Sequence, residues 1–253
     1  MSFIAIIPSR MTSTRLPGKP LKDIAGKPMV VRVAEQAVAS GAERIVVAAD
    51  SEVIAKTCSE YGVEAVLTDP DLPTGTDRLA EAADKLRLSD ETIVVNVQGD
   101  EPLIPPPVIR QVAELLASDP QSTIATAAHP IADVQTFFNP NVVKVELDGT
   151  GHAMTFSRAP IPWPRDAFAE DKSCLPEGFT AYHHIGLYAY RALFLKRFST
   201  LKRSPIERFE SLEQLRAMWY GYKIAVAVLP ENLPAGVDTQ EDLERVRSVF
   251  PNR

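Results

Sequence analysis

Short apolar runs recur along the first half of the chain, and segments of helical composition separate them. The runs lie at residues 3–7, 44–49, 63–67, 92–97 and 122–127. Such runs, bounded by turn residues, are typical of strands that are buried on both faces. Between them we predict helices over residues 29–40, 51–61, 78–87 and 108–117. This alternation of strand and helix predicts an α/β fold with a doubly wound, mostly parallel sheet.

The pattern changes after about Ala128. Residues 142–147 and 153–157 read as two antiparallel strands joined by a turn, and a proline-rich stretch over residues 160–176 reads as a long loop. A strand over 183–190, a helix over 206–219, a strand over 224–228 and a final helix over 239–249 follow. We therefore predict a single α/β domain over residues 1–253, in which residues 129–222 form a smaller antiparallel lobe.

Composition narrows the class of protein. The chain has 253 residues, is 45% hydrophobic and 24% charged, and carries a net charge of −6. An acidic protein of this kind is a poor nucleic-acid binder, so we expect no nucleic-acid partner. Its two cysteines, Cys58 and Cys174, form no recognisable disulfide or metal motif. No apolar stretch is long enough for a signal peptide or a membrane span, so we expect a cytoplasmic protein with no membrane partner.

The loop after the first predicted strand has the composition of a phosphate site. Residues 8–20 contain Arg10, Arg15 and Lys19, three hydroxyl residues after Arg10 that include Ser13, one glycine and no acid. Polyphosphates are bound by cations, hydroxyl donors and closely approaching backbone amides. Ligands of parallel sheets bind at the carboxyl ends of the strands, which favours this interpretation over a merely solvated loop. The glycine fingerprints of dinucleotide-binding and Walker loops are missing, which disfavours a dehydrogenase.

Two carboxylates are candidates for a magnesium site. Asp100 follows the strongest predicted strand, within residues 96–102, and Asp238 precedes the last predicted helix. Mg2+ sites commonly combine one or two carboxylates with phosphate oxygens and water. Each aspartate would alternatively serve only as a helix cap.

A glycine- and threonine-containing segment, residues 74–78, leads into a predicted helix. Thr74, Gly75 and Thr76 could offer groups to a base or ribose, and Arg78 could reach a phosphate. A plain helix cap by Thr76 or Asp77 fits the same segment equally well.

The second half of the chain holds candidates for binding an organic acid. Arg158 suits a substrate carboxylate, because guanidinium binds carboxylates with two parallel hydrogen bonds. His183 and His184 lie on a predicted strand, where a packing role is the common one. Glu210 and Gln214, with the glutamate between them at position 213, share one face of the predicted helix by their spacing, and that face could simply be solvated.

Taken together, these segments resemble one enzyme family along the chain from the first strand to the last helix. The motifs are Arg10, Ser13-Thr14-Arg15-Leu16-Pro17-Gly18-Lys19-Pro20, Gln98-Gly99-Asp100-Glu101-Pro102, Phe156-Ser157-Arg158-Ala159-x-Ile161-Pro162, His184-x-Gly186-x-Tyr188, Leu212-Glu213-Gln214-Leu215-Arg216 and Gly236-Val237-Asp238-Thr239. Their order and spacing resemble those of the 3-deoxy-D-manno-octulosonate cytidylyltransferases, the CMP-Kdo synthetases. The chain departs from the usual family pattern at Ser9, Met11, Thr74 and His183.

The resemblance implies a nucleotide-diphospho-sugar transferase-like fold and a homodimer formed through the lobe over residues 129–222. It implies that CTP and Kdo are converted to CMP-Kdo and pyrophosphate, for lipopolysaccharide core synthesis. By position, it implies a catalytic role for Arg10, Lys19 and Asp100, nucleotide binding by Ser13, Arg15, Thr74, Gly75, Thr76, Arg78 and Gln98, sugar-acid binding by Arg158, His184, Glu210 and Gln214, and Mg2+ binding by Asp100 and Asp238.

Two alternatives remain at this point. The acceptor could be another sugar acid, such as sialic acid or an amino-substituted Kdo, because such enzymes would share the nucleotide loops. The chain could also be a non-catalytic protein that binds nucleotide sugars, although the full set of charged residues disfavours this.

Overall fold

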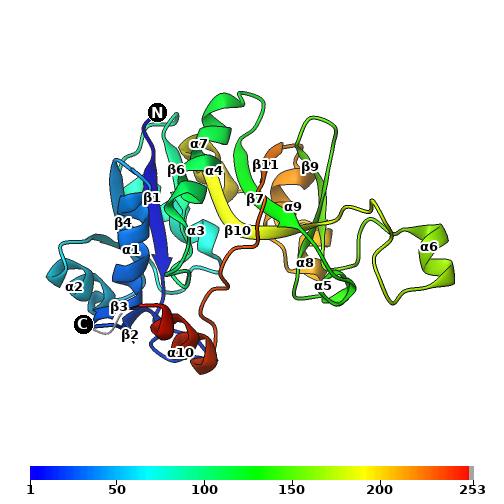
Figure 1. The fold of residues 1–253 in the computed structure, drawn as a ribbon. Helices are drawn as coiled ribbons and strands as arrows, with labels where there is room; N and C mark the ends of the chain where they lie inside the picture. The colour runs from blue at the N-terminus through cyan, green and yellow to red at the C-terminus, as the bar shows by residue number, and fades with distance from the viewer. Residues whose placement is uncertain (251–253) are drawn as a thin grey trace.

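A mixed sheet organises the protein, and a computed structural model describes residues 1–250 of it (Figure 1). The strand order is β11 (Ile224–Val228), β7 (Ile124–Pro130), β10 (Tyr182–Arg191), β6 (Ile93–Asn96), β1 (Ile4–Ser9), β4 (Arg44–Ala49) and β5 (Glu64–Leu67). The neighbours pair in parallel, except that β10 runs antiparallel to both β6 and β7. The predicted doubly wound, mostly parallel α/β fold is confirmed.

Helices cover both faces of this sheet. One face packs against α1 (Met29–Ala39), α2 (Glu52–Glu60) and α4 (Pro106–Ser118), and the other against α3 (Gly75–Lys85), α7 (Ala192–Phe198) and α9 (Gln214–Trp219). A hydrophobic core lies on each face of the sheet, and successive strand residues point into one and then the other. Ile7 packs on the face covered by α1, α2 and α4, and Ile6 on the face covered by α3, α7 and α9. Burial on both faces explains why these strands read as continuous apolar runs.

A small hydrophobic core, separate from those on the two faces of the sheet, lies near the carboxyl ends of the parallel strands and contains residues from both the first and the last part of the chain. It includes Leu16, Met29, Val237 and Leu243. Around it lie the 3-10 helix η1 (Lys19–Leu21), the two-stranded sheet of β2 (Asp23–Ile24) and β3 (Lys27–Pro28), and the last helix α10 (Gln240–Val249). This core holds the loop after β1 against the segment before α10.

The remaining elements extend the sheet at one end of β10. The strands β8 (Lys144–Leu147) and β9 (Ala153–Ser157) pair antiparallel, and β8 also pairs with the start of β10. The helices α5 (Val134–Phe138), α6 (Arg165–Glu170) and α8 (Pro205–Glu210) complete this region. Figure 1 shows α6 at the far right, well away from the main sheet. No helix within residues 1–250 is long and apolar enough to span a membrane.

Several local predictions were wrong. The predicted loop over residues 160–176 contains α6, and both α5 and α7 were missed. The single helix predicted over 206–219 is two helices, α8 and α9, separated where Ser211 adopts a left-handed φ of 54°. The backbone and side-chain groups of Ser157 and Arg158 bind Glu210 at this break. Glu210 and Gln214 therefore do not share one helix face.

Candidate active site

A cleft of about 720 Å³ opens at the carboxyl ends of β1 and β6, where the sequence placed the ligand site. Its walls come from the loop after β1, residues 72–78, the turn after β6 and the segment before α10. Most of the predicted nucleotide and metal residues line it, namely Arg10, Ser13, Arg15, Lys19, Thr74, Gly75, Arg78, Gln98, Asp100 and Asp238. The cleft thus brings together side chains that are more than 200 positions apart in the sequence.

Two glycines allow the backbone segments around Asp100 to approach closely. A Cβ atom on Gly99 would lie 2.7 Å from the carbonyl oxygen of Pro8, and one on Gly236 would lie 3.1 Å from the carbonyl oxygen of Asp100. The amide of Val237 donates a hydrogen bond of 2.8 Å to that same Asp100 carbonyl. Since any side chain would push these segments apart, Gly99 allows the Asp100 segment to pack against the end of β1, and Gly236 allows the Asp238 segment to pack against the Asp100 segment.

Lys19 connects the two candidate metal ligands. Its Nζ donates to Asp100 Oδ2 at 2.8 Å, to Asp238 Oδ1 at 3.1 Å and to the carbonyl oxygen of Val237 at 3.0 Å. Arg15 Nη2 lies 3.0 Å from the other oxygen of Asp238. The two carboxylates therefore face one point, and two cations compensate their charge there.

The segment over residues 74–78 opens α3 beside the cleft. The cap of this helix is Thr74, whose Oγ1 accepts a hydrogen bond from the Asp77 amide at 3.1 Å, so the alternative cap at Thr76 or Asp77 was wrong. Thr76 instead donates to Glu213 Oε2 at 2.6 Å. Arg78 is buried and donates to the carbonyl oxygen of Asp69, and its burial lowers the pKa of its guanidinium.

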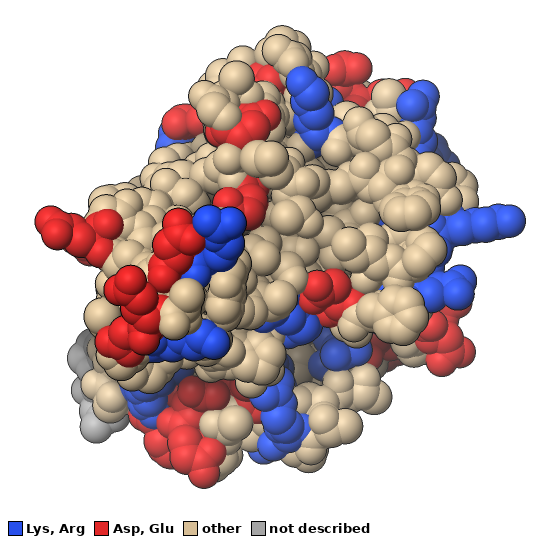
Figure 2. Space-filling view, turned by 90° about the vertical axis from the view of Figure 1, so that its right-hand side faces the viewer, with Lys and Arg blue, Asp and Glu red and all other residues tan. Residues whose placement is uncertain are grey.

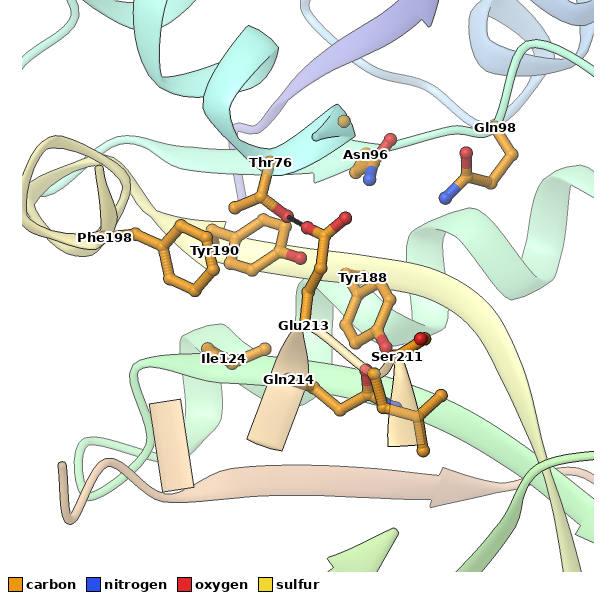
Figure 3. A pocket seen from close by; sticks show the side chains of 12 residues that line it. Thr76, Asn96, Gln98, Ile124, Tyr188, Tyr190, Phe198, Ser211, Glu213 and Gln214 are labelled. Carbon is orange, nitrogen blue, oxygen red and sulfur yellow. Dashed lines mark hydrogen bonds between the residues drawn. The ribbon is translucent and has the colours of Figure 1, made fainter. Parts of the chain in front are cut away.

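A smaller cavity of about 250 Å³ adjoins the cleft on the α3, α7 and α9 side of the sheet (Figure 3). The cleft and the cavity share Gly75, Gln98 and Glu213 in their walls. Of the predicted sugar-acid residues, Gln214 lines this cavity. The carboxyl group of Glu213 stands between the two spaces, and its burial raises its pKa, although the hydrogen bond from Thr76 opposes this.

Comparison with known proteins identifies the family of this chain. A family model for cytidylyltransferases matches residues 4–224. The chain belongs to the cytidylyltransferase family. The solved structure of a CMP:2-keto-3-deoxy-manno-octonic acid synthetase complexed with CTP is 38% identical to it, over 98% of both chains, with a TM-score of 0.89. HddC from Yersinia pseudotuberculosis, complexed with GMP-PN, is 18% identical over 98% of this chain and all of its own, with a TM-score of 0.64, and supports the fold alone.

Three of the predicted sugar-acid residues of this cytidylyltransferase lie outside the walls of both spaces. Arg158 and Glu210 bind each other instead, through a hydrogen bond of 2.7 Å from Arg158 Nε to the Glu210 carbonyl oxygen. His184 is buried beside Phe156, 3.0 Å from Thr126 Oγ1, and burial lowers its pKa to about 3. The neutral imidazole of His184 therefore has a packing role between β7 and β10. Because none of the three residues lines the cleft or the cavity, their contact with the sugar acid stays a prediction.

Several cavity residues of the cytidylyltransferase were not predicted as site residues. Glu213 and Tyr188 were noted as parts of family motifs but were given no role, and Asn96 and Tyr190 were read as strand residues. Tyr188 and Asn96 are direct partners across the antiparallel pair of β10 and β6. The only sequence signal was that Asn96 is a polar residue inside an apolar run. The antiparallel insertion of β10 between β6 and β7 was not visible in the sequence.

Proposed function

We propose that this cytidylyltransferase transfers CMP from CTP to the anomeric hydroxyl of 2-keto-3-deoxy-manno-octonic acid (Kdo) and releases pyrophosphate. The observation that carries the proposal is the 38% identity, over 98% of both chains, to a synthetase for that product in complex with CTP. The cleft supports it with Arg10, Arg15, Lys19 and Arg78, a set of cations that suits a triphosphate.

Pyrophosphate release tests this function directly. The purified protein is given Kdo and Mg2+ with CTP, ATP, GTP or UTP in turn, and then CTP with sialic acid in place of Kdo. We expect release with CTP and Kdo only. Release with sialic acid but not with Kdo would show that the acceptor is wrong, and no release from any pair would refute the enzyme activity.

We propose that Asp100 and Asp238 hold Mg2+. Their carboxylate oxygens lie 2.8 and 3.1 Å from one Lys19 nitrogen, so they face a common point, and carboxylates are the protein ligands that Mg2+ prefers. No group of three or more His, Cys, Asp or Glu side chains within residues 1–250 is arranged to hold a metal ion. A site of two carboxylates, completed by phosphate oxygens and water, is the usual composition for Mg2+ beside a nucleotide. When bound, the ion would polarise phosphate oxygens as a Lewis acid.

The residues of the chain itself would act mainly by positioning and by charge compensation, which dominate phosphoryl-type transfer. Lys19 and Arg10 would bind the phosphates and stabilise the negative charge that grows there as pyrophosphate leaves. Gln98 and Glu213 line both spaces, which favours contacts at the junction between nucleotide and sugar acid. The cavity beside the cleft would exclude bulk water from the part of the sugar acid that enters it.

A magnesium titration of pyrophosphate release tests the metal assignment. Asp100→Asn and Asp238→Asn keep the side-chain shape and remove the negative charge that holds a divalent cation. We expect turnover at saturating Mg2+ to fall by about two orders of magnitude or more in each variant. Normal turnover and an unchanged magnesium dependence in both variants would refute the assignment.

We also infer a homodimer and a cytoplasmic location. Large apolar side chains are exposed on the neighbouring elements α8, α9 and β9: Ile206, Phe209, Trp219 and Met154, with Phe209 91% exposed. Figure 2, which views this side of the molecule, shows a broad area without charged side chains over its middle. Such patches commonly mark protein interfaces. Sedimentation should give a dimer that Phe209→Asp weakens, and a wild-type monomer would refute it. The inferred cytoplasmic location rests on the cysteines. Cys58 and Cys174 are unpaired, as is usual in a reducing compartment such as the cytoplasm.

A further inference from the structure

The cavity beside the cleft differs from the cleft in charge. Its polar lining comes from one carboxylate, from amides and from hydroxyl groups, and no Lys or Arg among the described residues lines it. The cleft, by contrast, holds Arg10, Arg15, Lys19 and Arg78. The cavity therefore suits an uncharged, hydroxyl-bearing part of a ligand, and anionic groups suit the cleft.

Asn96 has an unsatisfied polar group in the wall of this cavity. It is the last residue of β6 and is 3% exposed. Its Oδ1 has no hydrogen-bond partner within residues 1–250. Figure 3 shows Asn96 between Thr76 and Gln98, above Tyr188, which is its partner across the strand pair. A buried amide without a partner costs about 1–3 kcal/mol, which a ligand hydroxyl could recover.

Two polar side chains beside Asn96, those of Thr76 and Gln98, already form hydrogen bonds with other groups. Thr76 Oγ1 donates to Glu213 Oε2 at 2.6 Å, and Gln98 Nε2 donates to the carbonyl oxygen of Gly186 at 3.1 Å. The amide of Asn96 offers both donors and acceptors, and a sugar hydroxyl can both donate and accept. A hydroxyl in the cavity would thus complete the hydrogen bonding of Asn96 without disturbing its neighbours.

We propose that Asn96 binds a hydroxyl group of the sugar acid and selects for a hydroxylated acceptor in this cavity. This rests on the proposed use of Kdo as acceptor. A site built to hydrogen-bond a hydroxyl discriminates strongly against an analogue that lacks it, because the amide is then left buried and unpaired. Asn96 lines the cavity and not the cleft that holds the cations, so it contributes to acceptor binding and not to the binding of CTP.

Asn96→Leu tests the proposal, because leucine has a similar shape and no hydrogen-bonding group. In pyrophosphate-release assays we expect KM for Kdo to rise about tenfold or more, since one buried hydrogen bond is lost. We expect kcat and KM for CTP to stay within about twofold, because binding that is equal in ground and transition states affects KM alone. The melting temperature should stay equal or rise, because an unpaired buried amide is removed.

Thr123→Val is the matched control. Thr123 Oγ1 is also buried without a partner among the described residues, but Thr123 lines neither the cleft nor the cavity. Its KM values should not change. An unchanged KM for Kdo in Asn96→Leu would refute the proposal. So would a parallel loss of kcat and melting temperature, which indicates a structural role.

If Asn96→Leu fails to fold, Asn96→Ser carries the same test, since its short side chain does not reach the hydroxyl. A normal KM for Kdo in that variant would also refute the proposal. A wild-type protein that is inactive with Kdo would instead refute the proposed function, before any variant is compared.

Discussion

Replacing Lys19 by methionine separates catalysis from stability at the centre of the cleft. The change removes one ammonium group and keeps most of the aliphatic side chain. In the wild-type protein Lys19 Nζ donates to Asp100 Oδ2 at 2.8 Å and to Asp238 Oδ1 at 3.1 Å. The variant loses both ion pairs, together with the cation that the proposed function assigns to the triphosphate.

The structure predicts a small loss of stability. The side chains of Asp100 and Asp238 are 36% and 48% exposed, so water already screens each ion pair. Pairs of this exposure contribute about 0–1 kcal/mol each, so we expect a loss of at most about 2 kcal/mol. For a protein of this size, that corresponds to a fall in melting temperature of no more than about 8 °C.

The predicted loss of activity is much larger. A preorganised group that stabilises charge in a transition state is worth about 2.7–4 kcal/mol, so kcat/KM for CTP should fall about 100- to 1000-fold. Pyrophosphate release at varied CTP measures this, and thermal melting measures stability. Lys22→Met is the control, because Lys22 directly follows η1, close to Lys19 in the sequence, and does not line the cleft. A kcat/KM within about threefold of wild type would refute the role of Lys19.

Three further changes probe the frame around the site. Gly99→Ala places a Cβ atom 2.7 Å from the Pro8 carbonyl oxygen, so we expect a loss of about 1–3 kcal/mol in urea titrations and a raised KM for CTP. The pKa of buried His184 is lowered from 6.5 to about 3, so the unfolded state takes up a proton first as the pH falls. Stability should therefore decrease from about pH 6.5 towards pH 3, and His184→Gln should flatten that decrease in urea titrations at several pH values. Arg216→Met removes the closer ion-pair partner of Glu207, at 2.6 Å, and leaves this 4% exposed carboxylate with the more exposed Arg203 at 3.5 Å, so thermal melting should show a loss of about 3 kcal/mol. Adding Glu207→Gln should recover most of that loss, and no recovery would contradict the ion-pair explanation.

The sequence predicted those parts of the site that follow directly from single strands. The cations of residues 8–20 follow β1, and Asp100 follows β6. Parallel strands have their carboxyl ends at the same edge of the sheet, so these residues are expected to lie close together. Their meeting in one cleft could therefore be inferred from the apolar runs alone. Asp238 was predicted only as a candidate, and it reaches Lys19 because Gly236 allows the last segment to approach Asp100.

The sugar-acid half of the site could not be predicted in the same way. Glu210 and Gln214 fit one helical face by spacing, but the left-handed Ser211 ends α8 between them. The hydrogen bonds that hold Glu210 come from Ser157 and Arg158, more than 50 positions earlier in the chain. Contacts between such distant segments override local helical preference, and the spacing of residues within one predicted helix gives no information about those contacts.

By itself, the sequence determined the alternating α/β layers and the phosphate-binding composition of the loop after β1, because apolar runs and turn residues act locally. Its motifs also indicated the enzyme family, which the comparison with known proteins confirmed. Only the tertiary structure decided that β10 lies antiparallel between β6 and β7. That insertion places Tyr188 opposite Asn96 and forms the cavity beside the cleft. Strand order depends on long-range packing and on chain connections, so the residues of this cavity became visible only in the folded protein.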